Sequence, residues 1–595
     1  MATKVHNWQV IIRSDQLCTN TQEIIASDLF RELLTRYVAR LDRYDSPLLA
    51  ALEVFRVEES AQEQNKGSKY DIDRLALFLS LLSEQGLSLI AGQVGIQEIN
   101  SVNRQQYREF VEGLYDFWRE HQRFLVADDN DGDTKSLSQK HNEFIDTIDR
   151  LKRLVLQSYR GIVANLQGSI PRVYRQLPAG SGAGLLLQQL DWNTLPYPYD
   201  QLAGIPFIQT AVIEPPLVYY PKRNVRQGVF KPVDSNPLCR TRINREDWYC
   251  FPVKVGPLLI FMHFHKRYMS LAVSMANLFE LADRLEIVGH RPDAILVFGV
   301  DPEDLGEDQT VYYEDHENNV VLGVVGRTDE VDYFGYVKKM ILTLHNTIMI
   351  ERGMLPVHGA MAHIDLKEGG VANVILMGDS GAGKSESIEA FRILADEYLR
   401  ELIVVFDDMG SLHIGPDGNV YGIGTEIGAF LRLDDLEPGF AYKEFQRSIF
   451  MNPHKTNARV VIPVTPYEDV IRPWKVDMFL YANNYQMVAN EGACIRVFDD
   501  PEDALQVFSR GARLSKGTTD EQGLVYTYFS NPFGAIQKRE KHEEIAGKFI
   551  NRMMETNVIV GELLTQLGLS GMEQKGPEAA AKALLSFIQK TCESK

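Results

Sequence analysis

Gly378-Asp-Ser-Gly-Ala-Gly-Lys-Ser385 is a complete G-x-x-x-x-G-K-S phosphate-binding loop. The residues before it, Val371–Met377, are apolar and predict a buried strand, and residues 386–396 have the apolar spacing of a helix. A strand, a glycine turn and a helix in this order allow backbone N–H groups and the helix N-terminus to surround an anion. The sequence therefore predicts a site for a nucleotide or for pyrophosphate.

Two residues of this loop have side chains suited to a nucleoside triphosphate and its cation. Lys384 is expected to lie along the β- and γ-phosphates, and the hydroxyl of Ser385 is expected to reach a Mg²⁺ ion. The donor is predicted to be ATP or GTP, with pyrophosphate as an alternative. The predicted cofactor-binding residues are those of the whole loop: Gly378, Asp379, Ser380, Gly381, Ala382, Gly383, Lys384 and Ser385.

Composition narrows the class of protein and of partner. A net charge of −19 argues against nucleic acid as a partner, because binding to a phosphate backbone needs a basic face. The five cysteines are scattered without a C-x-x-C pair, so neither a disulfide framework nor a zinc site is expected. No stretch approaches the roughly 20 apolar residues of a membrane span, and the N-terminal residues lack the pattern of a secretory signal. We expect a cytoplasmic protein that does not bind membranes.

The 595 residues are long enough for two to four domains, and we predict three regions. Residues 1–167 are expected to be mostly helical, residues 168–290 to be loop-rich and mixed, and residues 291–595 to form an α/β nucleotide-binding catalytic domain. An acidic stretch at 127–134 is compared with a calcium loop, but position 139 is Gln where that loop closes with Glu. An exposed connection between helices is the favoured interpretation of this stretch.

Polar residues follow or interrupt apolar runs on both sides of the loop. Leu402–Phe406 predicts a strand that ends in Asp407 and Asp408, where a carboxylate can hold the metal that bridges phosphates. His358 lies in a predicted strand, and for a histidine by itself a buried core residue is favoured over a ligand. Arg459 precedes an apolar strand, where it is either a surface charge or a group that neutralises a transferring phosphoryl group.

The ordered set of these pieces resembles the phosphoenolpyruvate carboxykinase superfamily, which includes HPr kinase/phosphorylase as a relative. The resemblance covers about residues 330–480. It implies an α/β fold in which a P-loop-containing, carboxykinase-like catalytic half follows the mostly helical N-terminal region. The matching pieces are Lys338-Lys339, His358, the loop 378–385, Asp407-Asp408, the segment 422–430 continued to Glu437-Pro438, and the strand Thr456–Pro463.

The resemblance also implies roles for individual residues. Lys339, His358 and Asp408 would coordinate a transition metal such as Mn²⁺, with the lysine as a neutral amine. Lys384 and Arg459 would stabilise the phosphoryl group, Ser385 would hold Mg²⁺, and Ser380 would approach the substrate. The predicted catalytic residues are Lys339, His358, Lys384, Asp407, Asp408 and Arg459, and the predicted metal ligands are Lys339, His358, Ser385 and Asp408.

Three functions remain open from the sequence. The first is a metal-dependent phosphotransferase that interconverts oxaloacetate and phosphoenolpyruvate with a nucleoside triphosphate. The second is an HPr kinase-like kinase acting on a protein serine or a small-molecule hydroxyl, because Gly-Asp-Ser-Gly-x-Gly-Lys-Ser-Glu and His358-Gly359 resemble that branch more closely. The third is a nucleotide-binding regulatory protein without turnover.

The partners that the sequence predicts follow from these functions. They are a nucleotide, an anionic small molecule, and a protein docked on the helical N-terminal region. Arg240, Arg242 and Arg245 are candidate ligands of the anionic substrate. Residues 505–535, with Arg510, Arg513 and Asn531–Gly534, are a candidate wall for the nucleotide base.

Overall fold

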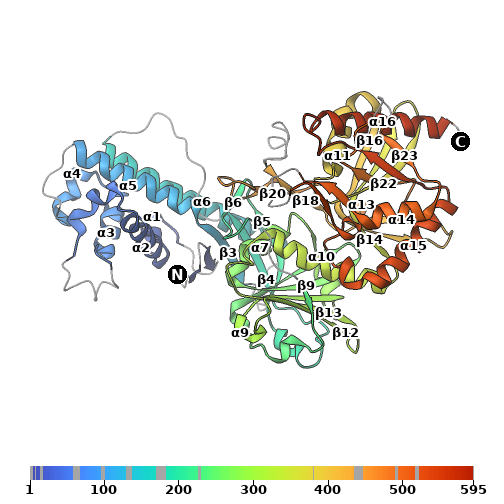
Figure 1. The fold of residues 1–595 in the computed structure, drawn as a ribbon. Helices are drawn as coiled ribbons and strands as arrows, with labels where there is room; N and C mark the ends of the chain where they lie inside the picture. The colour runs from blue at the N-terminus through green and yellow to red at the C-terminus, as the bar shows by residue number, and fades with distance from the viewer. Residues whose placement is uncertain are drawn as a thin grey trace. The chain divides into compact units, whose positions relative to one another are not determined.

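The chain forms two compact units in the computed structural model (Figure 1). Unit 1 contains residues 1–190, 204–220 and 449–456, and unit 2 contains residues 191–203, 221–448 and 457–595. The structure describes residues 4–6, 9–13, 18–57, 68–95, 101–128, 137–168, 182–224, 230–379, 381–433, 447–488, 493–515 and 522–593.

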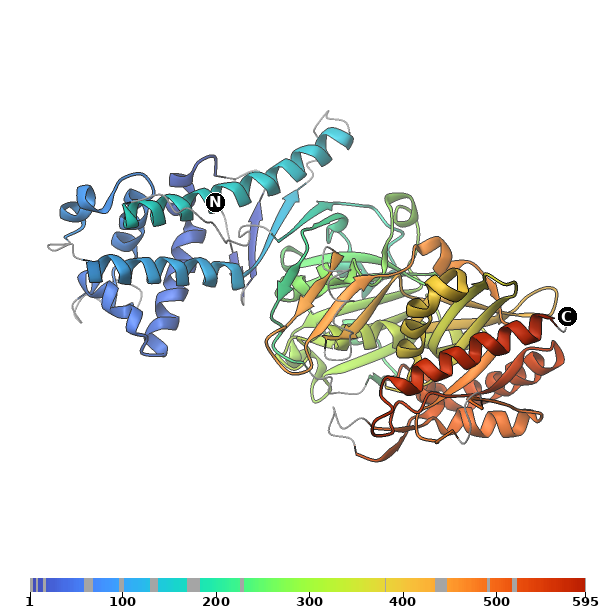
Figure 2. The same ribbon diagram turned by 90° about the horizontal axis from the view of Figure 1, so that it is seen from above.

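Unit 1 is built mainly from helices (Figure 2). Their apolar faces meet in one core, in which Leu33, Leu79 and Leu151 and their helical neighbours are buried. Ser27 and Asp71 cap two of the helices by accepting hydrogen bonds from backbone N–H groups of the first turn. The helices are α1 (Thr21–Ile25), α2 (Asp28–Arg43), α3 (Ile72–Leu82), α4 (Leu87–Ile90), α5 (Ser101–Glu120) and α6 (Leu137–Gln167).

Five strands of unit 1 lie beside these helices and pair with one another in a mixed arrangement. Its order is β1-β2-β3-β4-β5, in which β2 and β4 are parallel to β3, while the outer pairs are antiparallel. The short strands β6 (Leu217–Tyr219) and β19 (Ile449–Met451) pair in parallel elsewhere in the unit. The sheet strands are β1 (Lys4–His6), β2 (Gln9–Arg13), β3 (Gln122–Asp128), β4 (Ala183–Gln188) and β5 (Phe207–Ile213).

Unit 2 contains two larger sheets, and the first is mixed. β11 runs parallel to its neighbours β9 and β13, whereas β8 and β12 pair antiparallel at the two sides. β7 (Lys231–Pro232) and β10 (Glu280–Leu281) extend it. The main strands are β8 (Trp248–Val255), β9 (Leu258–His265), β11 (Ala294–Val300), β12 (Thr310–Asp315) and β13 (Val320–Gly326).

The second sheet of unit 2 carries the phosphate-binding loop. Its order is β21-β17-β16-β14-β15-β22-β26-β23, and β15, β22 and β26 run parallel. The predicted strand before the loop is confirmed with its predicted bounds. The strands are β14 (Leu355–Leu366), β15 (Val371–Met377), β16 (Leu399–Ile414), β17 (Val420–Gly424), β21 (Trp474–Lys475), β22 (Met478–Asn483), β23 (Ile495–Val497) and β26 (Ile559–Leu564).

Alternate residues of this sheet bury against helices on opposite faces. Met478 and Leu480 of β22 face a core shared with α11 (Lys384–Tyr398) and α16 (Lys575–Glu593). Phe479 and Tyr481 face the core of α14 (Pro501–Arg510) and α15 (Arg539–Glu555). Figure 1 shows these two helix pairs on either side of the strands. A strand buried on both faces has the continuous apolar sequence found here.

The helix α10 (Phe334–Glu351) packs against strands of both sheets of unit 2. It is buried along nearly its whole length, with Lys339 and Glu351 as the residues that retain exposure. A helix that is apolar on all sides belongs in the interior, and any charge on it must find a partner there. This requirement places Lys338 at the centre of the site described below.

The predicted α/β class is confirmed by this arrangement of sheets and helices. Residues 168–290, predicted as one region, are shared between the two units. Residues 129–134 of the acidic stretch, Ser380 and Glu437-Pro438 lie outside the described residues. Among the helices that the structure describes, none has both the length and the apolar composition needed to cross a membrane.

Replacing Leu480 by Ala tests the layered core of unit 2. Leu480 is fully buried between the sheet and its helices, so the cavity left behind should lower the free energy of unfolding by about 2–5 kcal/mol. The measurement is urea denaturation followed by circular dichroism. Leu285→Ala is the control, because Leu285 is 80% exposed and its loss should change stability little. Equal effects of the two variants would contradict the assignment of this core.

Candidate nucleotide and metal site

The phosphate-binding loop connects β15 directly to α11, as its sequence predicts. Gly381 and Gly383 have φ values of 80° and 99°, and a side chain on Gly383 would approach Thr565 to 2.7 Å. Lys384 is the first residue of α11, and its Nζ donates to the backbone oxygen of Asp379 at 3.2 Å. The loop is therefore curled around its own lysine, with backbone conformations that glycine adopts readily.

Residues at the ends of the neighbouring parallel strands hold the loop in place. The side-chain amide of Asn484, just after β22, donates to the backbone oxygen of Gly381 at 2.9 Å. The hydroxyl of Thr565, just after β26, donates to the oxygen of Ala382 at 2.7 Å. The carboxyl ends of parallel strands are where ligands bind in open α/β sheets. The loop therefore lies where the topology of this sheet would place a ligand.

Ser385 and Asp407 form the contact expected of a magnesium-binding pair. Ser385 Oγ donates to Asp407 Oδ1 at 2.8 Å, which joins the start of α11 to the end of the apolar part of β16. In P-loop proteins a hydroxyl and a carboxylate in these positions bind the cation on the phosphates. Burial raises the pKa of Asp407, and the nearby charge of Asp408 adds to the rise, against the lowering effect of Lys384.

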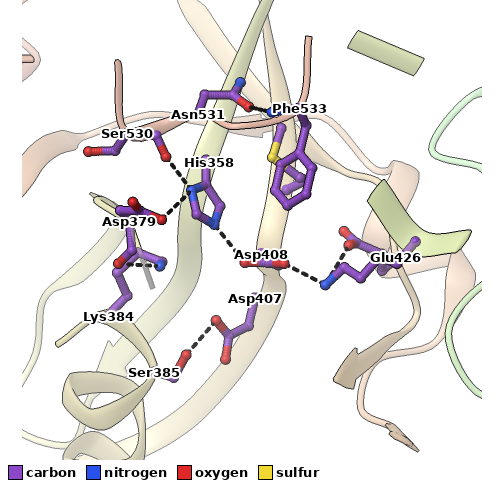
Figure 3. A network of polar contacts seen from close by, with 12 residues as sticks. His358, Asp379, Lys384, Ser385, Asp407, Asp408, Glu426, Ser530, Asn531 and Phe533 are labelled. Carbon is purple, nitrogen blue, oxygen red and sulfur yellow. Dashed lines mark hydrogen bonds and ion pairs between the residues drawn. The ribbon is translucent and has the colours of Figure 1, made fainter. Parts of the chain in front are cut away.

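His358 is completely buried on β14 and lies between two polar partners (Figure 3). Its Nδ1 forms a short hydrogen bond with the backbone oxygen of Ser530, and its Nε2 lies 2.9 Å from Asp408 Oδ1. A carbonyl oxygen and an ionised carboxylate can only accept, so Nδ1 donates to Ser530 and Nε2 donates to Asp408. A hydrogen bond from one ring nitrogen to a backbone carbonyl also orients the rings of metal-binding histidines.

Lys338, and not the predicted Lys339, approaches Asp408. Lys338 Nζ lies 2.5 Å from Asp408 Oδ2 and 3.4 Å from Glu426 Oε1. Burial lowers the pKa of Lys338, but the two carboxylates outweigh burial and the pKa is raised. Successive residues of a helix point about 100° apart, so Lys339 faces elsewhere and remains partly exposed. Lys338 is therefore the lysine that contacts Asp408, a position predicted from the sequence for Lys339.

The two adjacent aspartates differ in partners and in acidity. Burial raises the pKa of Asp408, but Lys338 and His358 outweigh it and hold the pKa well below its usual range. Asp407, in contrast, has a raised pKa. Opposite shifts in neighbouring carboxyl groups are a common way for active sites to assign different tasks to them. Asp408 therefore stays ionised, and its carboxylate is suited to bind a cation.

Glu426 is a member of the site for which no role was predicted from the sequence. It follows β17, is 2% exposed, and accepts a short hydrogen bond from Thr425 Oγ1 in addition to facing Lys338. Burial raises the pKa of Glu426 to about 7, an effect that Lys338 opposes and Asp408 reinforces. Its position within the glycine-rich, apolar segment 422–430 was the available signal, because an acid in such surroundings is buried and needs a partner.

Arg459 is connected to the site through aromatic rings. Its guanidinium lies 5.2 Å from the ring centre of Phe430, and that ring packs 5.0 Å from Phe334. Phe334 lies one helical turn before Lys338 on α10, so the two share a face. The structure thus brings Arg459 toward the same end of α10. Among the candidate substrate arginines, Arg245 donates to the backbone oxygens of Asp200 and Gln201 and so has a structural role.

The residues around Asp408 suit a transition metal by their chemistry. His358 Nε2 and the carboxylate of Asp408 converge, and the amine of Lys338 adjoins them. Imidazole and carboxylate are ligands of Mn²⁺ and similar ions, but His358 Nε2 and Lys338 Nζ must each lose a proton to bind. In the described part of the chain, no cluster of three or more His, Cys, Asp or Glu residues forms a metal site, so such a site would need Lys338.

Comparison with protein-family models and with curated proteins finds no match to this chain.

The pairing of Lys338 predicts a difference between the two adjacent lysines. Lys338→Met leaves Asp408 and Glu426 without their shared cation, so the free energy of unfolding should fall by about 3 kcal/mol. Lys339→Met should change it by less than about 0.5 kcal/mol, as for most partly exposed positions. Urea denaturation at neutral pH measures both. A larger loss for Lys339→Met would return the site to the residue predicted from sequence.

The raised pKa of Glu426 predicts a pH dependence of stability. Glu426 holds its proton more tightly in the folded protein than in the unfolded chain, where its pKa is about 4.3. Its contribution to stability is thus fully present below that value and is lost as pH rises through about 7. Relative to Glu426→Gln, the wild-type protein should become less stable between pH 5 and pH 8 in urea denaturation. Parallel curves would show that this carboxyl does not titrate there.

Proposed function

We propose that this protein is a metal-dependent phosphotransferase of phosphoenolpyruvate carboxykinase type. The observation that carries the proposal is that two adjacent carboxylates, Asp407 and Asp408, have different partners. Asp407 is bound to Ser385 at the start of the phosphate-binding loop helix, and Asp408 is bound to His358 and Lys338. The two carboxylates would thus serve two cation sites at the end of one strand. A reaction that must hold both a triphosphate and a second anionic reactant needs two such sites.

The chain's own residues have separate tasks in this proposal. The loop 378–385 binds the triphosphate through its backbone N–H groups, and Lys384 turns from its contact with the Asp379 carbonyl to the phosphates. Ser385 and Asp407 hold Mg²⁺, while Lys338, His358 and Asp408 hold Mn²⁺. When bound, the Mn²⁺ ion would supply a Lewis acid for the enolate oxygen of the substrate. Arg459 offers positive charge at the same end of α10.

The reaction balances without any further reactant. The bond between C3 of oxaloacetate and its carboxyl group breaks, carbon dioxide leaves, and the electron pair passes to the enolate oxygen. That oxygen then forms a bond with the γ-phosphorus as the bond to the β-phosphate oxygen breaks. The products are phosphoenolpyruvate and a nucleoside diphosphate. The reaction requires no proton transfer. This agrees with the site, because Asp408 is held as an anion and has no proton to donate.

A kinase acting on a hydroxyl, as in HPr kinase, is the second candidate. It is favoured by the raised pKa of Asp407, since a hydroxyl nucleophile must give up a proton and a carboxylate of raised pKa accepts one more readily. In this alternative the proton passes from the hydroxyl to Asp407, and the hydroxyl oxygen bonds to the γ-phosphorus. The acceptor would be a protein serine or a small molecule.

A single assay distinguishes these functions. Purified protein is incubated with Mg²⁺, Mn²⁺, oxaloacetate and ATP or GTP, and phosphoenolpyruvate and nucleoside diphosphate are measured together. We expect both products in equal amounts, and only when oxaloacetate is present. Diphosphate release that does not depend on oxaloacetate would favour the kinase. Nucleotide binding in calorimetry without release of diphosphate would mean a regulatory protein.

His358→Gln tests the assignment of the second cation site. Loss of the imidazole should reduce kcat by about 100-fold or more, because a ligand of the substrate-side cation is lost. The nucleotide affinity, measured by calorimetry with a non-hydrolysable analogue and Mg²⁺ but without Mn²⁺, should change less than about threefold, since His358 does not belong to the loop. A parallel loss of nucleotide affinity would contradict the separation of the two sites.

A further inference from the structure

Asp379 is an acidic residue within a loop whose proposed ligand is an anion. Its side chain is almost completely buried, and a bare carboxylate there would repel phosphate. The structure shows how this charge is balanced. Asp379 Oδ2 accepts from Arg513 Nε at 3.0 Å and from Thr527 Oγ1 at 2.8 Å, and Oδ1 lies 4.0 Å from His358 Nδ1. The carboxylate therefore faces the histidine and its own partners.

The carboxyl group of Asp379 is ionised in this environment. Burial raises its pKa, but His358 and Arg513 outweigh burial, and the pKa lies below its ordinary value. The imidazole of His358 consequently lies between two anions, Asp379 on the Nδ1 side and Asp408 on the Nε2 side (Figure 3). The first belongs to the nucleotide loop and the second to the proposed cation site.

Thr527 connects the same loop to His358 by a second route. Three residues after Thr527, the backbone oxygen of Ser530 receives the Nδ1 hydrogen bond of His358. The N–H of Ser530 donates back to the oxygen of Thr527 at 2.6 Å, so the turn is closed. Phe529 and Ser530 have φ values of 49° and 50°, a left-handed conformation that costs energy for residues other than glycine. Such strain persists when the surroundings hold the turn in one position.

Gly511 supplies part of that support from the end of α14. Its φ is 54°, and a side chain there would lie 1.8 Å from the backbone oxygen of Thr527. The N–H of Thr527 donates to the oxygen of Gly511 at 3.1 Å, and Arg513 follows on β24 (Ala512–Leu514). The turn and the arginine that binds Asp379 therefore belong to one packed segment with Thr527.

We propose that Asp379 and Thr527 are positioning residues that couple the phosphate-binding loop to the imidazole of His358. When the loop closes on a triphosphate, Asp379 moves with it, and its bonds to Thr527 and Arg513 carry the displacement to the Ser530 carbonyl. That carbonyl orients the ring whose Nε2 faces Asp408. The inference rests on the proposed function, in that it requires a nucleotide at the loop and a cation at His358.

Coupling of this kind has a measurable thermodynamic consequence. If the nucleotide-bound loop orients His358 for the cation, the nucleotide raises the affinity for Mn²⁺, and Mn²⁺ raises the affinity for the nucleotide by the same factor. We expect a factor of about ten, within the usual range for coupled sites. The factor depends on contacts that differ between the nucleotide-free and the nucleotide-bound protein. We assign the coupling to one such contact, the Thr527–Asp379 hydrogen bond.

Thr527→Val is the variant that tests the proposal. It removes the hydroxyl but keeps the side-chain shape and the Asp379–Arg513 ion pair, whereas Asp379→Asn would remove the charge that faces Arg513 in the interior and endanger folding. Mn²⁺ binding is titrated by electron paramagnetic resonance of the free ion, with saturating Mg²⁺ and with or without the β,γ-imido analogue of ATP. The GTP analogue replaces it if calorimetry selects guanine. A titration of His358→Gln identifies Mn²⁺ that exchanges into the magnesium site.

Two control variants complete the experiment. Thr527→Ser retains the hydroxyl and should keep the wild-type factor. Thr556→Val removes a hydroxyl that bonds to backbone oxygens at the end of α15 and not to Asp379, and it should also leave the factor unchanged. Thr527→Val should reduce the factor from about ten to less than about two. Each intrinsic affinity, measured with the other ligand absent, should change little.

The outcomes separate this inference from the proposed function. A Thr527→Val protein that melts at a lower temperature but keeps the full factor shows that the hydroxyl is only structural and overturns the coupling. Wild-type protein that binds nucleotide and Mn²⁺ independently also overturns the coupling while leaving the proposed function intact. Wild-type protein that binds no nucleotide overturns both.

Discussion

The burial of the Lys338 ammonium is the constraint on which the site depends. α10 is apolar on nearly all sides and packs against both sheets of unit 2, so the charge of Lys338 near its start cannot reach water. Removing an ammonium from water is compensated only by close opposite charge, and here Asp408 and Glu426 provide it. These partners come from β16 and from the residue pair that follows β17. The buried charge of Lys338 therefore fixes the position of α10 relative to β16 and β17.

That relation also determines where His358 lies. β14 pairs with β16 in antiparallel register, with Gly359 opposite Asp408, so the histidine is diagonal to the aspartate that binds Lys338. On its other side the ring is held by the Ser530 carbonyl. An imidazole that donates from both nitrogens to fixed acceptors has one orientation. Preorganisation of this kind reduces the reorganisation that a reaction would otherwise require.

The phosphate-binding half of the site could be predicted because its information is local. A strand, a glycine turn and a helix N-terminus are consecutive in the chain, and glycine at 381 and 383 is needed for backbone angles that the structure shows. Strands such as Val371–Met377 and Ala294–Val300 could also be located, since they are buried on both faces and are continuously apolar. The choice between Lys338 and Lys339 could not be made in this way. Both lysines fit the same pattern, and the rotation of α10 decides which one is buried.

The sequence alone determined the α/β class, the helical character of the N-terminal region, the phosphate-binding loop and the strand that ends in two aspartates. Each of these depends on residue types at short spacing, where hydrophobic periodicity and backbone preference act directly. Tertiary structure alone decided the partners: Lys338 with Asp408, Glu426 with Lys338, and Asp379 with Arg513 and Thr527. Arg513 and Thr527 lie more than a hundred residues from Asp379 along the chain. Charges must be paired once they are buried, but which charges are buried together follows from how helices and sheets pack, and no local pattern encodes that.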